Sequence, residues 1–108
     1  MATLAAQKIS QSGVAPAYQA AAAGGDEFAN GGRTVFHVKN GSAAAVTVTV
    51  KSQKPCNQGG THDLTVSVPA GGDRMIGPFD PARFNNSSGR VAVTYSAVTT
   101  ITVAPLEV

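Results

Sequence analysis

Apolar and polar residues alternate with a period of two along most of the chain after residue 32. The run VTVTV within 44–51 is the plainest case, because every second residue is valine and the residues between are threonines. A period of two in β-branched residues predicts strands with one buried face. We therefore expect strands over 33–39, 44–51, 64–68, 73–76, 90–95 and 99–103, separated by Gly, Pro, Asn and Ser.

The first two of these strands are expected to pair with each other. Asn40-Gly41 lies between them, and Asn-Gly is a frequent turn sequence in antiparallel hairpins. Pro69 ends the third strand, because proline cannot donate to a strand ladder. The alternation in RTVFHVK places Thr34, Phe36 and Val38 on one side of its strand and Arg33, Val35, His37 and Lys39 on the other.

The first thirty residues do not show this alternation. A short alanine run at 20–23 favours a helix, but Gly24-Gly25 follows at once, and helices that short are marginal. We interpret residues 1–30 as an extended N-terminal arm with one or two edge strands, near 6–9 and 18–21. The whole pattern predicts an all-β fold, a small antiparallel β-sandwich (jelly-roll or immunoglobulin-like) over 31–108 that carries this arm.

Composition limits the partners. The chain has 108 residues, 13% of them charged, a net charge of +2 spread without clusters, and no Trp. Nucleic-acid binders concentrate their cations and add stacking aromatics, so we expect no nucleic-acid partner. We expect no membrane partner, because no apolar run approaches the roughly 20 residues that span a bilayer. We expect no secretory signal, because the N-terminus lacks a basic segment followed by an apolar core. The single cysteine excludes an internal disulfide, which fits synthesis in a reducing cytosol.

Residues able to support catalysis or metal binding are few and unfavourably spaced. Cys56 precedes His62 and Asp63 across a glycine-rich loop, and nothing in that spacing brings a thiol and an imidazole within hydrogen-bond reach. Zinc needs about four ligands, whereas the chain has one Cys and two His. We interpret His37 as a histidine at the rim of a sheet or in an interface. We expect no catalytic residue, no cofactor and no metal, and therefore a protein that is not an enzyme.

Three stretches resemble the head decoration proteins (also called cement or auxiliary capsid proteins) of tailed bacteriophages. GGDEFANGGRTVFHVKNGS at 24–42 resembles the segment entering the first long hairpin, and 46–85, with VPAG followed by IGPF, resembles the body. GRVAVTYSAVTTITVAPL at 89–106 resembles the closing hairpin. The resemblance implies a β-sandwich made in the host bacterial cytoplasm that binds the outer surface of the major capsid protein lattice, commonly as a trimer, and stabilises the mature head. Related modules serve as head–tail connectors or tail components, and a module binding host-surface carbohydrate is a third alternative.

Three surfaces are candidates for contact with the capsid or with neighbouring copies. The arm could add a strand to a neighbour, or it could fold on its own sheet. The loop IGPFDPARF at 76–84 is rigid and carries interface residue types, although its two Phe side chains could instead plug the sandwich. The loop KSQKPCNQ at 51–58 could meet an acidic patch or could simply be solvated. The contact residues would be Lys8, Ile9 and Tyr18 in the arm, Phe79, Arg83 and Phe84 in the second loop, and Lys51 and Lys54 in the third.

Overall fold

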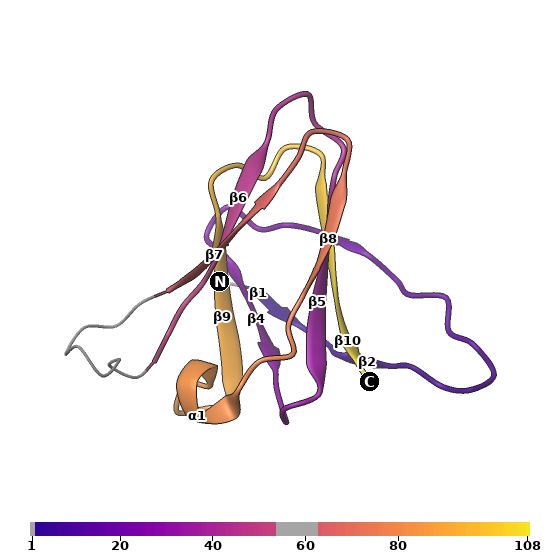
Figure 1. The fold of residues 1–108 in the computed structure, drawn as a ribbon, viewed down its shortest axis with the longest axis vertical. Helices are drawn as coiled ribbons and strands as arrows, with labels where there is room; N and C mark the ends of the chain where they lie inside the picture. Colours follow the sequence, from indigo (N-terminus) through magenta and orange to yellow (C-terminus); the bar gives the residue numbers. More distant parts are fainter. Residues whose placement is uncertain (1, 54–62) are drawn as a thin grey trace.

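The chain folds into two β-sheets packed face to face, and the computed structural model describes residues 2–53 and 63–108 (Figure 1). Sheet A has the strand order β1-β4-β9-β6-β7, and sheet B has the order β2-β10-β5-β8, with β3 also pairing on β10. The elements are β1 (Ala2–Leu4), β2 (Gln7–Lys8), β3 (Gln19–Ala20), β4 (Asp26–Ala29), β5 (Thr34–Asn40), β6 (Val46–Val50), β7 (Leu64–Val68), β8 (Asp73–Ile76), α1 (Pro81–Phe84), β9 (Arg90–Tyr95) and β10 (Ile101–Glu107).

The predicted all-β sandwich is confirmed, but its sheets are mixed rather than purely antiparallel. The parallel pairs come from the arm, in which β1 runs along β4 and β2 runs along β10. The pairings among β4 to β10 are antiparallel. The arm makes the sheets mixed because it adds one strand to each of them: β1 lies at the edge of sheet A, parallel to β4, and β2 lies at the edge of sheet B, parallel to β10.

The core lies between the two sheets and is built from the side chains that the alternation assigned to one face. Phe28 of sheet A stacks on Phe36 of sheet B, with ring centroids 4.9 Å apart. Both rings are fully buried, so this stack joins the sheets at the centre of the sandwich. The valines of β6 and the inward residues of β5 are buried as predicted: Val46, Val48, Val50, Thr34, Phe36 and Val38.

The predicted hairpin between the first two strands is wrong. β5 pairs with β10 and β8 in sheet B, whereas β6 pairs with β7 and β9 in sheet A. The turn after Asn40 therefore carries the chain from one sheet to the other, which lets the two apolar faces pack against each other. The buried Asn40 amide donates to the carbonyl oxygens of Ala44 and Val68, at 2.9 and 3.1 Å, and so ties this crossing to the end of β7.

The expected closing hairpin is also wrong, because β9 lies in sheet A and β10 in sheet B. The last strand runs from Ile101 to Glu107 and so continues beyond the predicted end at 103. It contains Pro105, which is buried opposite Phe36. β10 pairs with β5 along its whole length, and this makes it the central strand of sheet B rather than the return of a hairpin.

The first thirty residues lie on the chain's own sheets and contribute four strands to them. The edge strands expected near 6–9 and 18–21 are present as β2 and β3. β1 and β4 were not predicted, and β4 carries Phe28 into the core. The segment between β2 and β3 projects from the sandwich (Figure 1), and the Gln7 side chain closes its base through two hydrogen bonds to the backbone of Ala17.

Candidate functional site

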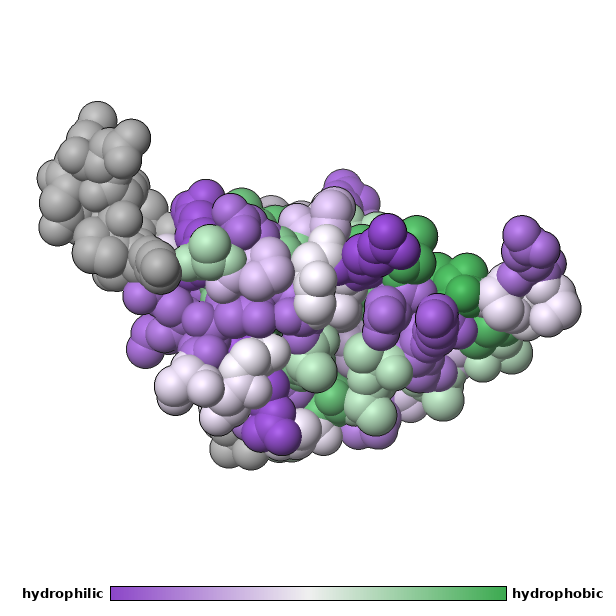
Figure 2. All heavy atoms as spheres, turned by 90° about the horizontal axis from the view of Figure 1, so that it is seen from below, coloured by the Kyte–Doolittle hydropathy of each residue, from purple (hydrophilic) through white to green (hydrophobic). Residues whose placement is uncertain are grey.

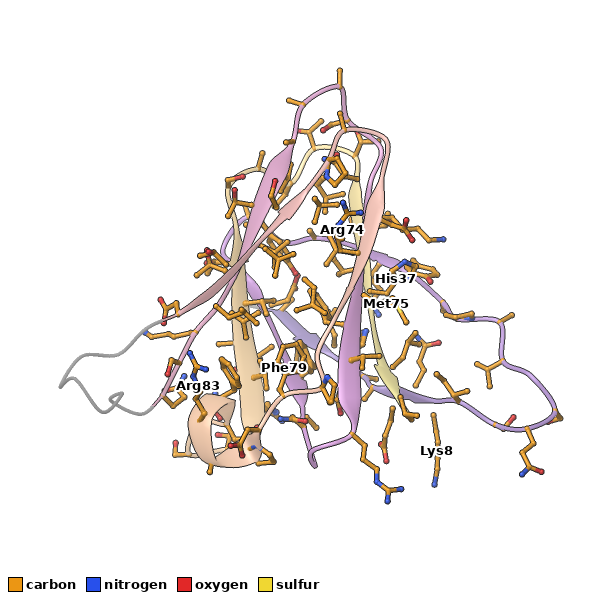
Figure 3. The ribbon with its side chains drawn as sticks, in the orientation of Figure 1. Lys8, His37, Arg74, Met75, Phe79 and Arg83 are labelled. Carbon is orange, nitrogen blue, oxygen red and sulfur yellow. The ribbon has the colours of Figure 1, made fainter. Side chains whose placement is uncertain are left out.

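Exposed hydrophobic side chains concentrate on one outer surface of the sandwich. Among the described residues, the large ones are Ile9, Val14, Met75 and Val108. Met75 pairs with His37, whose neighbours in β5 point into the core, so both face outward from sheet B. Figure 3 shows them on the side of the sheet away from Phe79. Clustered exposed apolar residues mark binding surfaces more reliably than single ones.

Val108 and Ile9 lie on the same side of sheet B as Met75. Leu106 pairs with the outward residue Val35 and with Gln7, and Val108 and Ile9 each follow two residues later along the chain, so they face the same way. Figure 2 agrees, since hydrophobic surface gathers toward the side that bears the arm. We define the outer face of sheet B as the outward residues of its strands together with these flanking residues: Ile9, Tyr18, Arg33, Val35, His37, Lys39, Asp73, Met75 and Val108.

A chain of hydrogen bonds crosses this face from one edge to the other. The Tyr18 hydroxyl lies 2.6 Å from His37 Nδ1, and His37 Nε2 lies 2.6 Å from Asp73 Oδ2. Tyr18 comes just before β3, His37 lies on β5 and Asp73 begins β8, so three separate segments are linked. Both contacts are satisfied by a neutral imidazole when Tyr18 donates to Nδ1 and the Nε2 proton is donated to Asp73.

Charges around this chain of bonds support it. The hydrogen bond from His37 lowers the pKa of Asp73 below its ordinary value, with smaller contributions from Arg74 and Lys39. Lys39 Nζ lies 4.0 Å from the centre of the Tyr18 ring, a cation–π contact that covers the aromatic surface. The arrangement lies on the outer surface of a sheet, and its effect is to hold the end of the arm against β5 and β8.

Beside this chain of bonds is an apolar hollow of about 410 Å³, lined by Gly32, Arg33, Val35, Pro78 and Val108. Gly77 makes the hollow's shape possible, because its φ of +123° lies in a region that favours glycine. A Cβ at this position would lie 3.1 Å from the carbonyl oxygen of Thr34. The close approach brings Pro78 against the start of β5, where its ring forms one wall.

The predicted arm contacts divide between two faces. Ile9 and Tyr18 belong to the outer face of sheet B, and Tyr18 is half-buried there by its contacts with His37 and Lys39. Lys8 is exposed and pairs in register with Glu107, so it alternates to the other side of β2. Of the two hypotheses for the arm, the structure shows the one in which it folds on its own sheets.

Of the two alternatives for Phe79 and Phe84, contact with a partner or plugging of the sandwich, the structure shows the second, because both side chains are buried, with exposed fractions of 1% and 6%. Phe79 packs against Phe28 at 5.8 Å and against Phe84 at 5.7 Å, so the two rings close the end of the sandwich. The one-turn helix α1 positions Phe84: Asp80 caps it by accepting a hydrogen bond from the Ala82 N–H. Arg83 stays at the surface with its guanidinium 4.8 Å from the centre of the Phe84 ring.

The third predicted surface is described only at its beginning. Lys51 is exposed just after β6, and its backbone N–H donates to the carbonyl oxygen of Ala92 in sheet A. It therefore lies away from the outer face of sheet B. Lys54, Cys56 and His62 lie outside the described residues.

Sequence reasoning assigned no contact role to Arg33, Val35, Asp73, Met75 or Val108. A signal for the first two was present, because the alternation in 33–39 had placed Arg33, Val35, His37 and Lys39 together on one side of the strand, without deciding which side is buried. The others depend on strand pairing, since Asp73 and Met75 meet β5 only through the β5–β8 register. His37, expected at the rim of a sheet or in an interface, lies on β5 between β10 and β8 and so is not at the rim. The interface alternative stays a prediction.

The fold and this face together define a small two-sheet β-sandwich with one apolar and basic outer surface. Among residues 2–53 and 63–108, no cluster of His, Cys, Asp and Glu is arranged to hold a metal ion. In the same residues no helix is long and apolar enough to cross a membrane. Comparisons with family models, with curated proteins and with solved structures found no significant match to the chain.

Proposed function

We propose that this protein is a non-enzymatic capsid decoration protein that binds the outer surface of the major capsid protein lattice of a tailed bacteriophage. The resemblance of 24–42, 46–85 and 89–106 to head decoration proteins motivates the proposal. The observation that supports it further is the outer face of sheet B, where exposed apolar side chains adjoin an arginine that forms no ion pair with a carboxylate of the described residues. Such a surface is suited to binding another macromolecule.

The role is mechanical. Packaged DNA places the head under internal pressure, and a protein that bridges neighbouring capsomers resists it. Binding that favours the expanded lattice over the precursor shell shifts the population toward expansion and slows disassembly by mass action. The protein would lie on the capsid exterior of the virion as a trimer or in contact with neighbouring copies. Because only 13% of the residues in the chain are charged, few charges need to be desolvated in such close packing.

Aromatic side chains favour this proposal over a carbohydrate-binding module. Sugar-binding sites use exposed aromatic platforms, but the four phenylalanines are buried in the core and Tyr18 is covered by Lys39. The other tyrosine, Tyr95, is turned to the buried carboxylate of Asp26. Within the described residues the aromatic rings are thus committed to contacts inside the chain.

Cryo-electron microscopy of shells mixed with the purified protein tests the proposal. The shells are virions stripped of this protein, or expanded empty shells, and a parallel sample of precursor shells serves as the control. Regular density over the outer lattice, with better survival of the shells on heating, is the expected result. Density confined to the portal vertex would make the protein a connector or tail component, and an absence of density would overturn capsid binding.

A further inference from the structure

We propose that the outer face of sheet B is the surface that contacts the shell, and that its hollow receives an apolar side chain adjacent to a carboxylate on a shell protein. This inference rests on the proposed function and assigns to it a surface and a partner chemistry. It replaces the predicted contact through 76–84, whose phenylalanines are buried.

Arg33 supplies the charged part of the recognition. It is exposed at the rim of the hollow, and it forms no ion pair with any carboxylate of the described residues. Glu107 lines a second, neighbouring hollow together with Arg33, but the two side chains form no ion pair. A guanidinium binds a carboxylate through two parallel hydrogen bonds, which makes an unpaired arginine in an apolar rim selective for an acidic group.

Val35, Pro78 and Val108 supply the apolar part. Val108 is 63% exposed and Met75, farther along the same face, is 56% exposed. An apolar centre with a polar rim is the usual arrangement of a protein interface. Since the hollow is open and already formed by Gly77 and Pro78, an apolar side chain could enter it without rearrangement of the sandwich.

A second copy of this chain offers few free carboxylates to this face. Its carboxylates are engaged within the chain, apart from Glu107, which stands alone among the described residues. The engaged groups are Asp26 with Tyr95, Glu27 with Arg90, Asp63 with the Ser52 N–H, Asp73 with His37 and Asp80 with the Ala82 N–H. These engagements favour a different protein as the occupant, because the one carboxylate without a partner among the described residues, Glu107, is half-buried.

Nucleic acid and lipid fit this face less well. Arg33 and Lys39 flank opposite ends of β5, roughly 20 Å apart at about 3.3 Å per residue. The residues between them on this face are Val35 and His37, of which His37 is bonded to Asp73. A phosphate backbone is bound by cations that follow it closely, and here apolar surface separates them.

Binding of charge-matched variants to the shells tests the face. Arg33→Gln/Met75→Glu alters two exposed positions of this face, and Ser67→Glu/Thr94→Glu alters two exposed positions on sheet A. The pairs change the net charge equally. We expect the first pair to reduce the apparent affinity for expanded shells at least tenfold and the second pair to change it less than twofold. Circular dichroism and the unfolding midpoint establish that each variant is folded.

A milder set keeps the test decisive if a glutamate variant fails to fold. Arg33→Gln/Met75→Gln is compared with Ser67→Gln/Thr94→Glu, which changes the net charge equally, and only the first pair should weaken binding. If the wild type binds shells, and both pairs leave that binding unchanged or weaken it equally, the assigned face is overturned and the proposed function stands. A wild type that does not bind shells would overturn both. Stronger binding to phosphatidylglycerol vesicles or to duplex DNA than to shells would overturn the protein partner.

Discussion

The two outer faces of the sandwich differ in chemistry although both sheets bury the same kinds of side chain. On sheet A, Thr49 pairs with Thr65 on one side and with Thr94 on the other, so hydroxyl groups lie in a row across three strands. Its charges are paired, with Arg90 Nη1 3.1 Å from Glu27 Oε1. The outer face of sheet A therefore carries short hydroxyl side chains and an ion pair formed within the sheet.

The outer face of sheet B instead combines exposed Met75 and Val108 with an arginine that lacks a partner among the described carboxylates. The alternation of each strand determines which residues face outward, but it places no demand on what those residues are. Threonine suffices where a face meets only water. The contrast therefore indicates that the exposed apolar side chains and the arginine on the outer face of sheet B serve something other than folding.

The largest effect is expected from a substitution in the core, which both sheets share. Phe36→Ala deletes the ring that stacks on Phe28 at 4.9 Å, and the loss of buried apolar area together with the cavity should cost about 3–5 kcal/mol. Denaturant unfolding measures this cost. Met75→Ala, an exposed position on the same sheet, is the control and should cost far less. A small effect of Phe36→Ala would show that the core is not organised around this stack.

The next largest effect is expected for Tyr95, the tyrosine of sheet A. Tyr95 donates to the buried Oδ2 of Asp26 at 2.7 Å, and Oδ1 of that carboxylate has no partner among the described residues. Tyr95→Phe removes this donor and should lower the free energy of unfolding by about 1–3 kcal/mol. Asp26→Asn in the Tyr95→Phe background should recover part of the loss, as a double-mutant cycle would measure. Additive effects would contradict the coupling.

Tyr95 also makes the free energy of unfolding depend on pH in the alkaline range. Burial, together with the hydrogen bond to Asp26, raises the pKa of Tyr95 above its ordinary value of 10.0. Below that value Tyr95 is neutral in both states and contributes no slope. Above it, the unfolded chain loses the proton first, so the free energy of unfolding should fall as pH rises. Thermal unfolding between pH 8 and about 11 should show this fall in the wild type and a weaker one in Tyr95→Phe.

A smaller effect is expected for Tyr18, whose hydroxyl serves the surface of sheet B. Tyr18→Phe removes the hydrogen bond to His37 and should cost on the order of 1 kcal/mol, because solvent can reach the site. The loss should be local, with faster amide exchange in β3 and little change in β6 or β9. Gln7→Ala, which removes the hydrogen bonds to Ala17, is a second arm variant for comparison. Uniformly faster exchange would show that the arm is not a separable unit.

The smallest effect is expected on the outer face of sheet A. Thr94→Ala and Ser67→Ala alter exposed hydroxyl positions, and each should change the free energy of unfolding by less than about 0.5 kcal/mol. Neither should alter binding to shells. A loss of shell binding here would reverse the comparison between the faces and assign the contact to sheet A.

The sequence alone determined the strands after residue 32 and the side of each that is buried. Alternation is a local property, so VTVTV and RTVFHVK each identify their inward residues without knowledge of their partners. It also placed Arg33, Val35, His37 and Lys39 together on one side of their strand, and the structure shows that this side faces outward.

Only the tertiary structure decided which strands pair and which aromatics are buried. Asn40-Gly41 is compatible with a hairpin, but burying the apolar faces of β5 and β6 against each other requires that the chain cross between sheets. Phe79 and Phe84 follow a Gly-Pro turn and a one-turn helix, where no period indicates an inward side. Asp73 reaches His37, and Val108 reaches Val35, only through registers formed between segments far apart in the chain. Such pairings depend on the packing of the whole sandwich, which local sequence patterns do not encode.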